Sequence, residues 1–372
     1  MRNKMSKGCN AITERARHVR HVGGAGRSIG RVSVSAESSP EPDPTRPAVR
    51  SGPANPADAA PLSRPDLVEH ASASIALGSK SFAAASRLFD PATRERAWLL
   101  YAWCRRCDDI ADGQVAGHGT RRVADAPARL AEIAAKTDAA LAGEVVDDPA
   151  FDALRVVAAE TRLPPAFARD LIAGFALDAD EWRPQTEQDL LRYCYHVAGA
   201  VGCMMAVVMG VAPEDDATLD RACDLGLAFQ LANIARDVGE DAAAGRCYLP
   251  ADWLAEVGVP ADDLMNPAHR PALATLGARL GALASGYEAS ARRGTPALPF
   301  RSAWAVLAAA AIYGAIGREV ARRGERAWDV RVTTSKAAKL AFIARAAGQA
   351  ARRAALYPPA PRDPALWTRP RD

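Results

Sequence analysis

The chain has 372 residues and a formal net charge of only +3 at pH 7, so a basic surface for binding nucleic acid is not indicated. Its seven cysteines are too few and too scattered for a disulfide-built scaffold. Five of them fall within apolar helical patterns, where a thiol acts as a small apolar group. We therefore expect a reducing intracellular compartment, the cytoplasm. These five are Cys104, Cys107, Cys194, Cys203 and Cys223.

Residues 1–65 are predicted to form a disordered extension rich in Arg, Gly, Ser and Pro, because they show no helical apolar period. The first part is Arg-rich around a single acid, Glu14, and resembles a transit peptide in composition. A tail without function and a misplaced start codon are the alternatives. The Gly24-Ala25-Gly26 cluster has neither a strand before it nor a helix after it, and is only a weak nucleotide-binding signal.

From residue 66 to about 369 the sequence predicts a single all-helical domain of about ten helices around one core. Alanine and unbranched long side chains favour helices, and alternating strand patterns are rare. A further short helix is expected after the loop at Tyr248-Leu249-Pro250. The longer helices are expected at 67–88, 92–112, 126–141, 164–177, 188–209, 215–238, 271–293, 301–323 and 335–354.

Two long apolar stretches, 197–213 and 303–317, are shorter than the roughly 20 residues that a spanning helix needs. We predict that both are buried core helices.

Two acidic motifs carry the strongest chemical signal. Asp108 and Asp112 lie four residues apart in one predicted helix, and Asp237 and Asp241 lie four apart in another, so each pair leaves one helix face. The first face continues through Tyr101 and Arg105, and the second through Gln230 and Asn233. A solvated acidic helix face is the alternative for either motif alone.

The other positions of both helices are apolar, so these carboxylates are expected to point into the protein, where a bare negative charge is very costly. Oxygen ligands without a His cluster select Mg²⁺, with Mn²⁺ as the alternative. Two such pairs suit metal ions held on a diphosphate, with Arg105 and Arg236 neutralising the charge of the leaving group.

A third patch, Tyr193-Cys194-Tyr195-His196-Val197-Ala198-Gly199-Ala200-Val201-Gly202, has small residues that would thin one side of a helix and open room for a long ligand. A close helix crossing is the alternative.

These motifs, together with Gly78-Ser79-Lys80-Ser81-Phe82 and Gly245-Arg246-Cys247-Tyr248-Leu249-Pro250, stand in the order seen in the squalene and phytoene synthase family. The chain resembles that family from about residue 66 to Leu366-Trp367, and most resembles its bacterial phytoene synthases. The resemblance implies an isoprenoid-synthase helical bundle with a central apolar cavity.

The resemblance also implies roles for individual residues. Asp108, Asp112, Asp237 and Asp241, with Asn233, would hold the metal ions. Tyr193, with Val197 and Ala198, would line the central cavity, where Tyr193 would manage cation or proton chemistry. The substrate would contact Ser81, Phe82, Tyr101, Arg105, Gln230, Asn233, Arg236, Tyr313 and Arg331. The chain departs from the family pattern at one position: some members have His where this chain has Gly78. A diphosphate contact from a histidine side chain is therefore absent here.

The activity implied is head-to-head condensation of two geranylgeranyl diphosphates through a cyclopropyl diphosphate to phytoene, for carotenoid synthesis, without NADPH. A squalene or presqualene diphosphate synthase using farnesyl diphosphate stays open, and so does a non-catalytic assembly factor. The latter would be expected to lose motif aspartates, but all four are present. The basic stretch 336–353 predicts a solvated helix face, with peripheral contact to the inner face of an anionic membrane as the alternative.

Overall fold

A computed structural model describes residues 61–112 and 125–371 of the chain. Most of the predicted extension 1–65, including the Gly24-Ala25-Gly26 cluster, therefore lies outside the described residues. The side chains of Lys80, Ser81 and Asp112 lie outside them as well.

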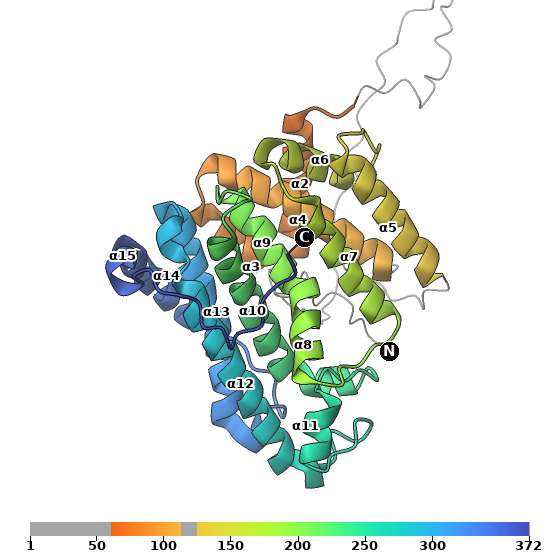
Figure 1. Ribbon diagram of the computed structural model, residues 1–372, viewed down its shortest axis with the longest axis vertical. Coiled ribbons are helices and arrows are strands. Elements are labelled where there is room, and N and C mark those ends of the chain that lie inside the picture. Colours follow the sequence, from red (N-terminus) through yellow and green to blue (C-terminus); the bar gives the residue numbers. More distant parts are fainter. Residues whose placement is uncertain (1–60, 113–124, 372) are drawn as a thin grey trace, which may run out of the picture. The chain divides into compact units, whose positions relative to one another are not determined.

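The described residues form helices and contain no strand, which confirms the predicted all-helical fold (Figure 1). The longer helices are α2 (Arg64–Gly78), α4 (Pro91–Asp112), α5 (Ala126–Leu141), α6 (Pro149–Thr161), α7 (Pro165–Ala179), α10 (Asp216–Ala242), α12 (Arg270–Arg292), α13 (Phe300–Arg323) and α14 (Lys336–Ala351). The shorter ones are α3 (Lys80–Ala85), α8 (Glu187–Cys194), α9 (Ala200–Val208), α11 (Ala251–Glu256) and α15 (Arg353–Leu356).

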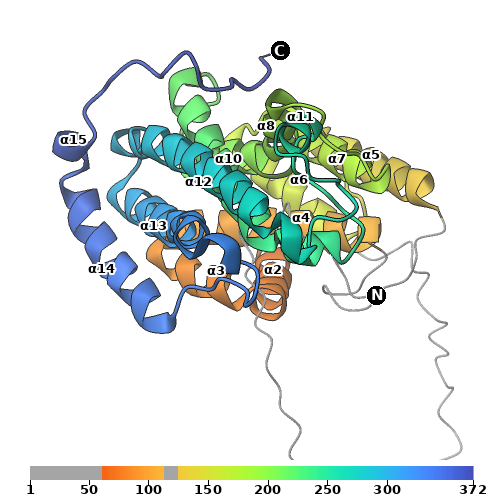
Figure 2. The ribbon, with the colours of Figure 1, turned by 90° about the horizontal axis from the view of Figure 1, so that it is seen from below.

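The central helix of the bundle is α10. It packs against α9, α12 and α13. A second group of helices, α2, α4, α5, α6 and α7, is joined to it through α9, which contacts both α7 and α10. Figure 2 shows the chain after α15 leaving the helices and running back across the bundle. One continuous apolar cluster fills the interior, as predicted.

Two expected helices are broken in the structure, the first of them by a local cap. The predicted helix 67–88 ends at Gly78, because Ser79 takes up an extended conformation and its hydroxyl accepts a hydrogen bond from the Phe82 amide at 3.2 Å, which caps α3. The predicted helix 335–354 is likewise divided into α14 and α15. Helix α6 was not predicted, although Asp148 followed by Pro149 is an N-terminal signal.

The predicted helix 188–209 is interrupted by a π-helical turn at Tyr195–Gly199. There the Ala200 amide donates to the Tyr195 carbonyl five residues back, instead of four. This turn is the middle of the small-residue patch, and one extra residue in the turn shifts which side chains of α9 face α10.

Two segments have the length and hydropathy of membrane spans, Glu187–Val208 and Phe300–Arg326. The first is 78% buried within the protein and the second 44%. The burial of the first agrees with its prediction as a core helix, whereas the second is only partly enclosed.

Candidate active site

The first acidic motif is buried on α4. Asp108, Arg105 and Tyr101 each expose 5% or less of their surface, so the predicted stripe points into the protein. Arg105 Nη2 donates to Asp109 Oδ1 at 2.5 Å, and its Nη1 lies 3.8 Å from Asp108 Oδ2. Burial alone lowers the pKa of Arg105, but the charges of Asp108 and Asp109 outweigh it and raise that pKa, so the guanidinium stays charged.

Asp109 was not among the predicted site residues, yet it is the closest partner of Arg105. Arg105 and Asp109 are also four residues apart in the helix, so their contact could have been predicted from the sequence. Asp112 is the last residue of α4.

The second acidic motif forms a continuous buried stripe along α10. Gln230, Asn233, Asp237 and Asp241 expose 2% of their surface or less. Their steps of three, four and four residues place them on one helix face, as predicted. Neither amide atom of Gln230, nor Oδ1 of Asn233, has a hydrogen-bond partner among the described residues. Burying such groups is costly unless a ligand completes their bonding.

Two arginines converge on Asp237. Arg236 makes a two-point contact with both carboxylate oxygens at 2.9 Å. Arg331, from the loop before α14, donates to Asp237 Oδ1 at 3.2 and 2.9 Å and lies 3.1 Å from Glu240 Oε1. The structure thus brings Arg236 and Arg331 to the second motif, as the resemblance implied.

The donor set of the two stripes fits hard divalent cations. It consists of carboxylate and amide oxygens, and Gln230 Oε1 and Asn233 Oδ1 have no hydrogen-bond partner within the described part of the chain. No three His, Cys, Asp or Glu side chains of the described part lie close enough to form one compact metal site. The geometry suits ions held jointly by the protein and by the oxygens of a bound diphosphate.

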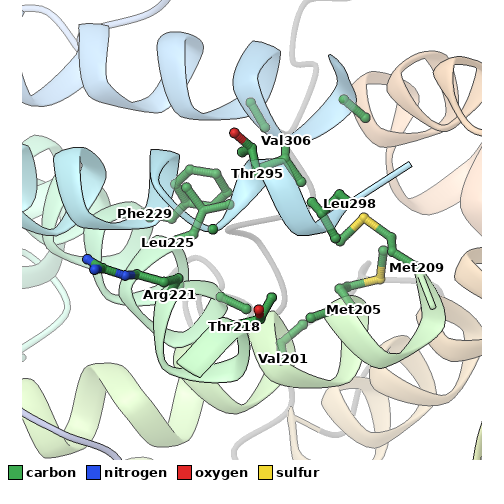
Figure 3. Close-up of a pocket in the computed structure, with 18 of the residues that line it drawn as sticks. Val201, Met205, Met209, Thr218, Arg221, Leu225, Phe229, Thr295, Leu298 and Val306 are labelled. Carbon is green, nitrogen blue, oxygen red and sulfur yellow. The ribbon is translucent and has the colours of Figure 1, made fainter. Parts of the chain in front are cut away.

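An apolar cavity of about 150 Å³ begins beside the α10 stripe. Figure 3 shows 18 of its lining residues. The lining comes mainly from α3, α9, α10, α13 and the end of α12 with the segment that follows it. Phe229, directly before Gln230, lines it, and so do Phe82 and Ala198 from the predicted site. Tyr313 stacks on Phe229 with ring centroids 4.2 Å apart. The stretch of α10 that lines the apolar cavity is therefore followed directly by the stretch that carries the polar stripe.

Tyr101 connects the first motif to this cavity. Its ring lies 5.8 Å from that of Phe82, and both residues line a small neighbouring space beside α9. A Cβ atom at Gly78 would lie 2.3 Å from the Tyr101 hydroxyl oxygen. The Tyr101 hydroxyl therefore occupies the place that a larger side chain at position 78 would need.

Tyr193 and Val197, which were expected to line the central cavity, are not among the residues that line this cavity. Val197 packs on α7, where a Cβ at Gly174 would lie 2.8 Å from its Cγ1.

The Tyr193 side chain belongs to a buried polar network instead. The Tyr193 and Tyr248 hydroxyls donate to Asp178 Oδ1 at 3.0 and 2.9 Å, and the two rings stack at 5.0 Å. Burial, reinforced by the charge of Asp178, raises the pKa of Tyr193 well above its ordinary value. Asp178 was not predicted, because its position in α7 offers no motif. The role of Tyr193 in cation or proton chemistry stays a prediction.

The small-residue patch also makes a close helix crossing, the alternative considered for it. A Cβ at Gly226 would lie 2.3 Å from the Ala198 carbonyl oxygen, and one at Gly202 would lie 2.4 Å from that of Ala222. Only glycine lets the backbones approach this closely. Because Ala198 and Gly202 also line the cavity, the crossing forms part of the cavity wall.

Comparison with known proteins gives consistent matches over this region. The family model described as squalene/phytoene synthase matches residues 75–338. The chain is 52% identical over 297 residues to a 15-cis-phytoene synthase of Enterobacter agglomerans, covering 79% of this chain and 99% of that protein. It is 48% identical over 312 residues to a 15-cis-phytoene synthase of Pantoea ananas, covering 83% and 100%.

Solved structures agree with these matches. A dehydrosqualene synthase in complex with ligand superposes with a TM-score of 0.68 at 28% identity, covering 77% of this chain and 96% of that one. Squalene synthase HpnC from Alicyclobacillus acidocaldarius has a TM-score of 0.64 at 25% identity, with 71% and 97% covered.

Proposed function

The chain belongs to the squalene/phytoene synthase family, and we propose that it joins two geranylgeranyl diphosphates head to head to make phytoene, a step of carotenoid synthesis. The observation that carries the proposal is the continuity of α10, whose buried polar stripe leads directly into an apolar cavity. A diphosphate head and a prenyl tail need these two environments in this order. The family is one of prenyltransferases that act on prenyl diphosphates.

We propose that Mg²⁺ is held by Asp108, Asp112, Asn233, Asp237 and Asp241. The bound ions would neutralise the charge that develops on the departing diphosphates. Arg105, Arg236 and Arg331 would donate hydrogen bonds to the same oxygens. Since Arg236 and Arg331 already contact Asp237, diphosphate would enter an existing network of charges.

The protein's further contribution is to exclude water. The cavity wall is built mainly from apolar side chains, which would keep water away from a carbocation formed inside it. Joining two twenty-carbon chains to phytoene releases two diphosphates and two protons, and consumes no reductant. We therefore propose that the reaction runs without NADPH.

Product analysis tests the proposal. Purified protein with Mg²⁺ would be given geranylgeranyl diphosphate or farnesyl diphosphate, each with and without NADPH. Phytoene from the twenty-carbon substrate, without NADPH, is the expected result. Presqualene diphosphate or squalene from the fifteen-carbon substrate alone would overturn the substrate assignment and favour the sister activity. Absence of any product would overturn the proposed function.

We also propose that the enzyme is cytoplasmic and lies peripherally on the membrane that receives its hydrocarbon product. Residues 336–356 contain no acidic side chain, and Leu340 on α14 exposes 68% of its surface. Sedimentation with vesicles of phosphatidylglycerol, compared with phosphatidylcholine, tests this. Lys336→Glu with Arg345→Glu should abolish cosedimentation, and equal binding by this variant would contradict the proposal.

A further inference from the structure

Arg221 forms part of the wall of the apolar cavity in its half remote from the aspartates. Residues of α10 that line the cavity run from Phe229 back to Thr218, and Arg221 lies about 18 Å along the helix axis from Asn233. The aliphatic part of Arg221 faces the cavity while its guanidinium points away from it (Figure 3). A Cβ at Gly294 would lie 2.7 Å from Arg221 Cβ, so the chain after α12 presses closely on this wall.

The guanidinium of Arg221 is held by the C-terminal segment 357–371, which we name the strap. Arg221 Nη2 donates to the Ala360 carbonyl oxygen at 2.9 Å, and its Nη1 donates to Ser290 Oγ at 2.6 Å. Ser290 in turn donates to Asp224. Arg221 is thus the residue of α10 that both lines the cavity and contacts the strap directly.

The strap is fixed to α10 by buried ion pairs. Arg362 makes a two-point contact with the fully buried Asp224, at 2.9 and 2.7 Å. Arg369 lies 2.9 Å from Asp220 and pairs with Asp216. Asp216, Asp220 and Asp224 are spaced by four residues, so the strap follows one face of the first two turns of α10. The Trp367 amide also donates to the Tyr287 hydroxyl on α12.

From these contacts we infer that Arg221 is a specificity-determining residue for prenyl chain length, held in place by the strap. This inference rests on the proposed function. A substrate whose head binds at the aspartates directs its tail toward Arg221, and an extra isoprene unit would collide with the Arg221 wall. Because the guanidinium is anchored on Ser290 and Ala360, the wall cannot swing aside without breaking the hydrogen bonds that tie it to the strap.

A competition experiment tests the inference. The full-length enzyme would receive an equimolar mixture of farnesyl, geranylgeranyl and geranylfarnesyl diphosphates, and the chain lengths in the products would be measured by mass spectrometry. Arg221→Ala removes the wall, and we expect the incorporation of twenty-five-carbon relative to twenty-carbon units to rise roughly tenfold. Arg221→Lys keeps the aliphatic wall and a cation, and should stay within about twofold of the wild-type ratio.

A second variant frees the strap without touching the cavity. Asp224→Asn combined with Arg362→Met removes both members of the ion pair together, and asparagine keeps an acceptor oxygen for the Ser290 hydroxyl. The same shift in chain length is expected, but smaller, because Arg221 itself remains. Arg371→Ala is the matched control, since Arg371 pairs with Asp220 at 2.7 Å on a more exposed part of the strap, and its product ratio should not change.

The outcomes separate the inference from the function on which it rests. An unchanged chain-length ratio in Arg221→Ala, with phytoene still formed, would overturn the inference and leave the proposed function intact. If Arg221→Ala does not fold, an unchanged ratio in the double variant would overturn it. Wild-type enzyme that makes no product from geranylgeranyl diphosphate would overturn the proposed function itself.

Discussion

Arg331 donates two hydrogen bonds to one oxygen of Asp237, although 94 positions separate the two residues. This contact brings the loop before α14 onto the second acidic motif, and Asp237 also accepts both bonds from Arg236. A buried carboxylate between two guanidinium groups is held in one orientation, which prepares it to bind a cation together with a diphosphate.

Replacing Asp237 by Asn tests the second motif. The change keeps the shape of the side chain but removes its charge, so we expect the rate of phytoene formation to fall about 100-fold or more and the Mg²⁺ concentration for half-maximal rate to rise. Glu240→Gln is the control, because Glu240 contacts Arg331 from an exposed position. An Asp237→Asn enzyme with wild-type rate and Mg²⁺ dependence would remove Asp237 from the proposed site.

Replacing Gly78 by Ala tests the close approach of α2 to α4. The new Cβ would lie 2.3 Å from the Tyr101 hydroxyl oxygen, so we expect the free energy of unfolding to fall by about 1–3 kcal/mol. Adding Tyr101→Phe should recover much of that loss, because the hydroxyl is gone. Urea unfolding of the two single variants and the double variant gives the coupling energy.

Gly286→Ala is the matched control for this cycle. Gly286 is an exposed glycine within α12 with nothing near its Cβ position, so alanine there should stabilise the protein by about 0.4–1 kcal/mol. A Gly78→Ala protein as stable as the wild type would show that α2 can shift away from Tyr101.

Asp178 is predicted to hold the orientation of two tyrosines. Its Oδ1 accepts hydrogen bonds from Tyr193 and Tyr248, so Asp178→Ala leaves two hydroxyls without their acceptor and should cost about 1–3 kcal/mol for each. Asp178→Asn retains an acceptor oxygen and should cost much less. Equal stability of the two variants, measured by urea unfolding, would contradict this account.

The stability of the protein should fall as the pH drops below about 6.5 because of His196. Burial lowers the pKa of His196 below its ordinary value of 6.5, and the nearby charge of Asp170 only partly offsets this. The unfolded chain therefore binds the proton at a higher pH than the folded protein, and stability is lost between 6.5 and the folded pKa.

His196→Gln should remove this part of the pH dependence. The free energy of unfolding, measured in urea between pH 5 and pH 7.5, should fall less steeply for the variant than for the wild type. His70→Gln, on the exposed side of α2, serves as the matched replacement. An identical slope in His196→Gln and the wild type would assign the pH dependence to other groups.

Sequence could predict those parts of this site whose residues recur at helical spacing within one segment. The α10 stripe follows from steps of three and four residues between Gln230 and Asp241, and its burial follows from the apolar residues on the rest of the helix. The polar stripe near the end of α4, which begins at Tyr101, follows from the same reasoning. The described side chains of both stripes are buried in the structure as expected.

The parts that sequence could not predict depend on contacts between distant segments. Arg362, in the strap, looks like an ordinary charge in a proline-rich tail, and only the folded chain brings it to Asp224, 138 positions earlier. Asp178 likewise accepts a hydrogen bond from Tyr248, which lies 70 positions later in the chain. Neither contact has a local period, so no pattern within one helix could indicate it.

The π turn at Tyr195–Gly199 makes the cavity dependent on the number of residues in this helix as well as on their identity. Loss of one residue there would restore ordinary α-helical bonding and turn α9 by about 100° relative to α8. Val201 and Met205, which line the cavity, would then point elsewhere. Single-residue deletions between 195 and 199 should therefore be tolerated far worse than conservative replacements, so related chains that keep this cavity should align here without gaps.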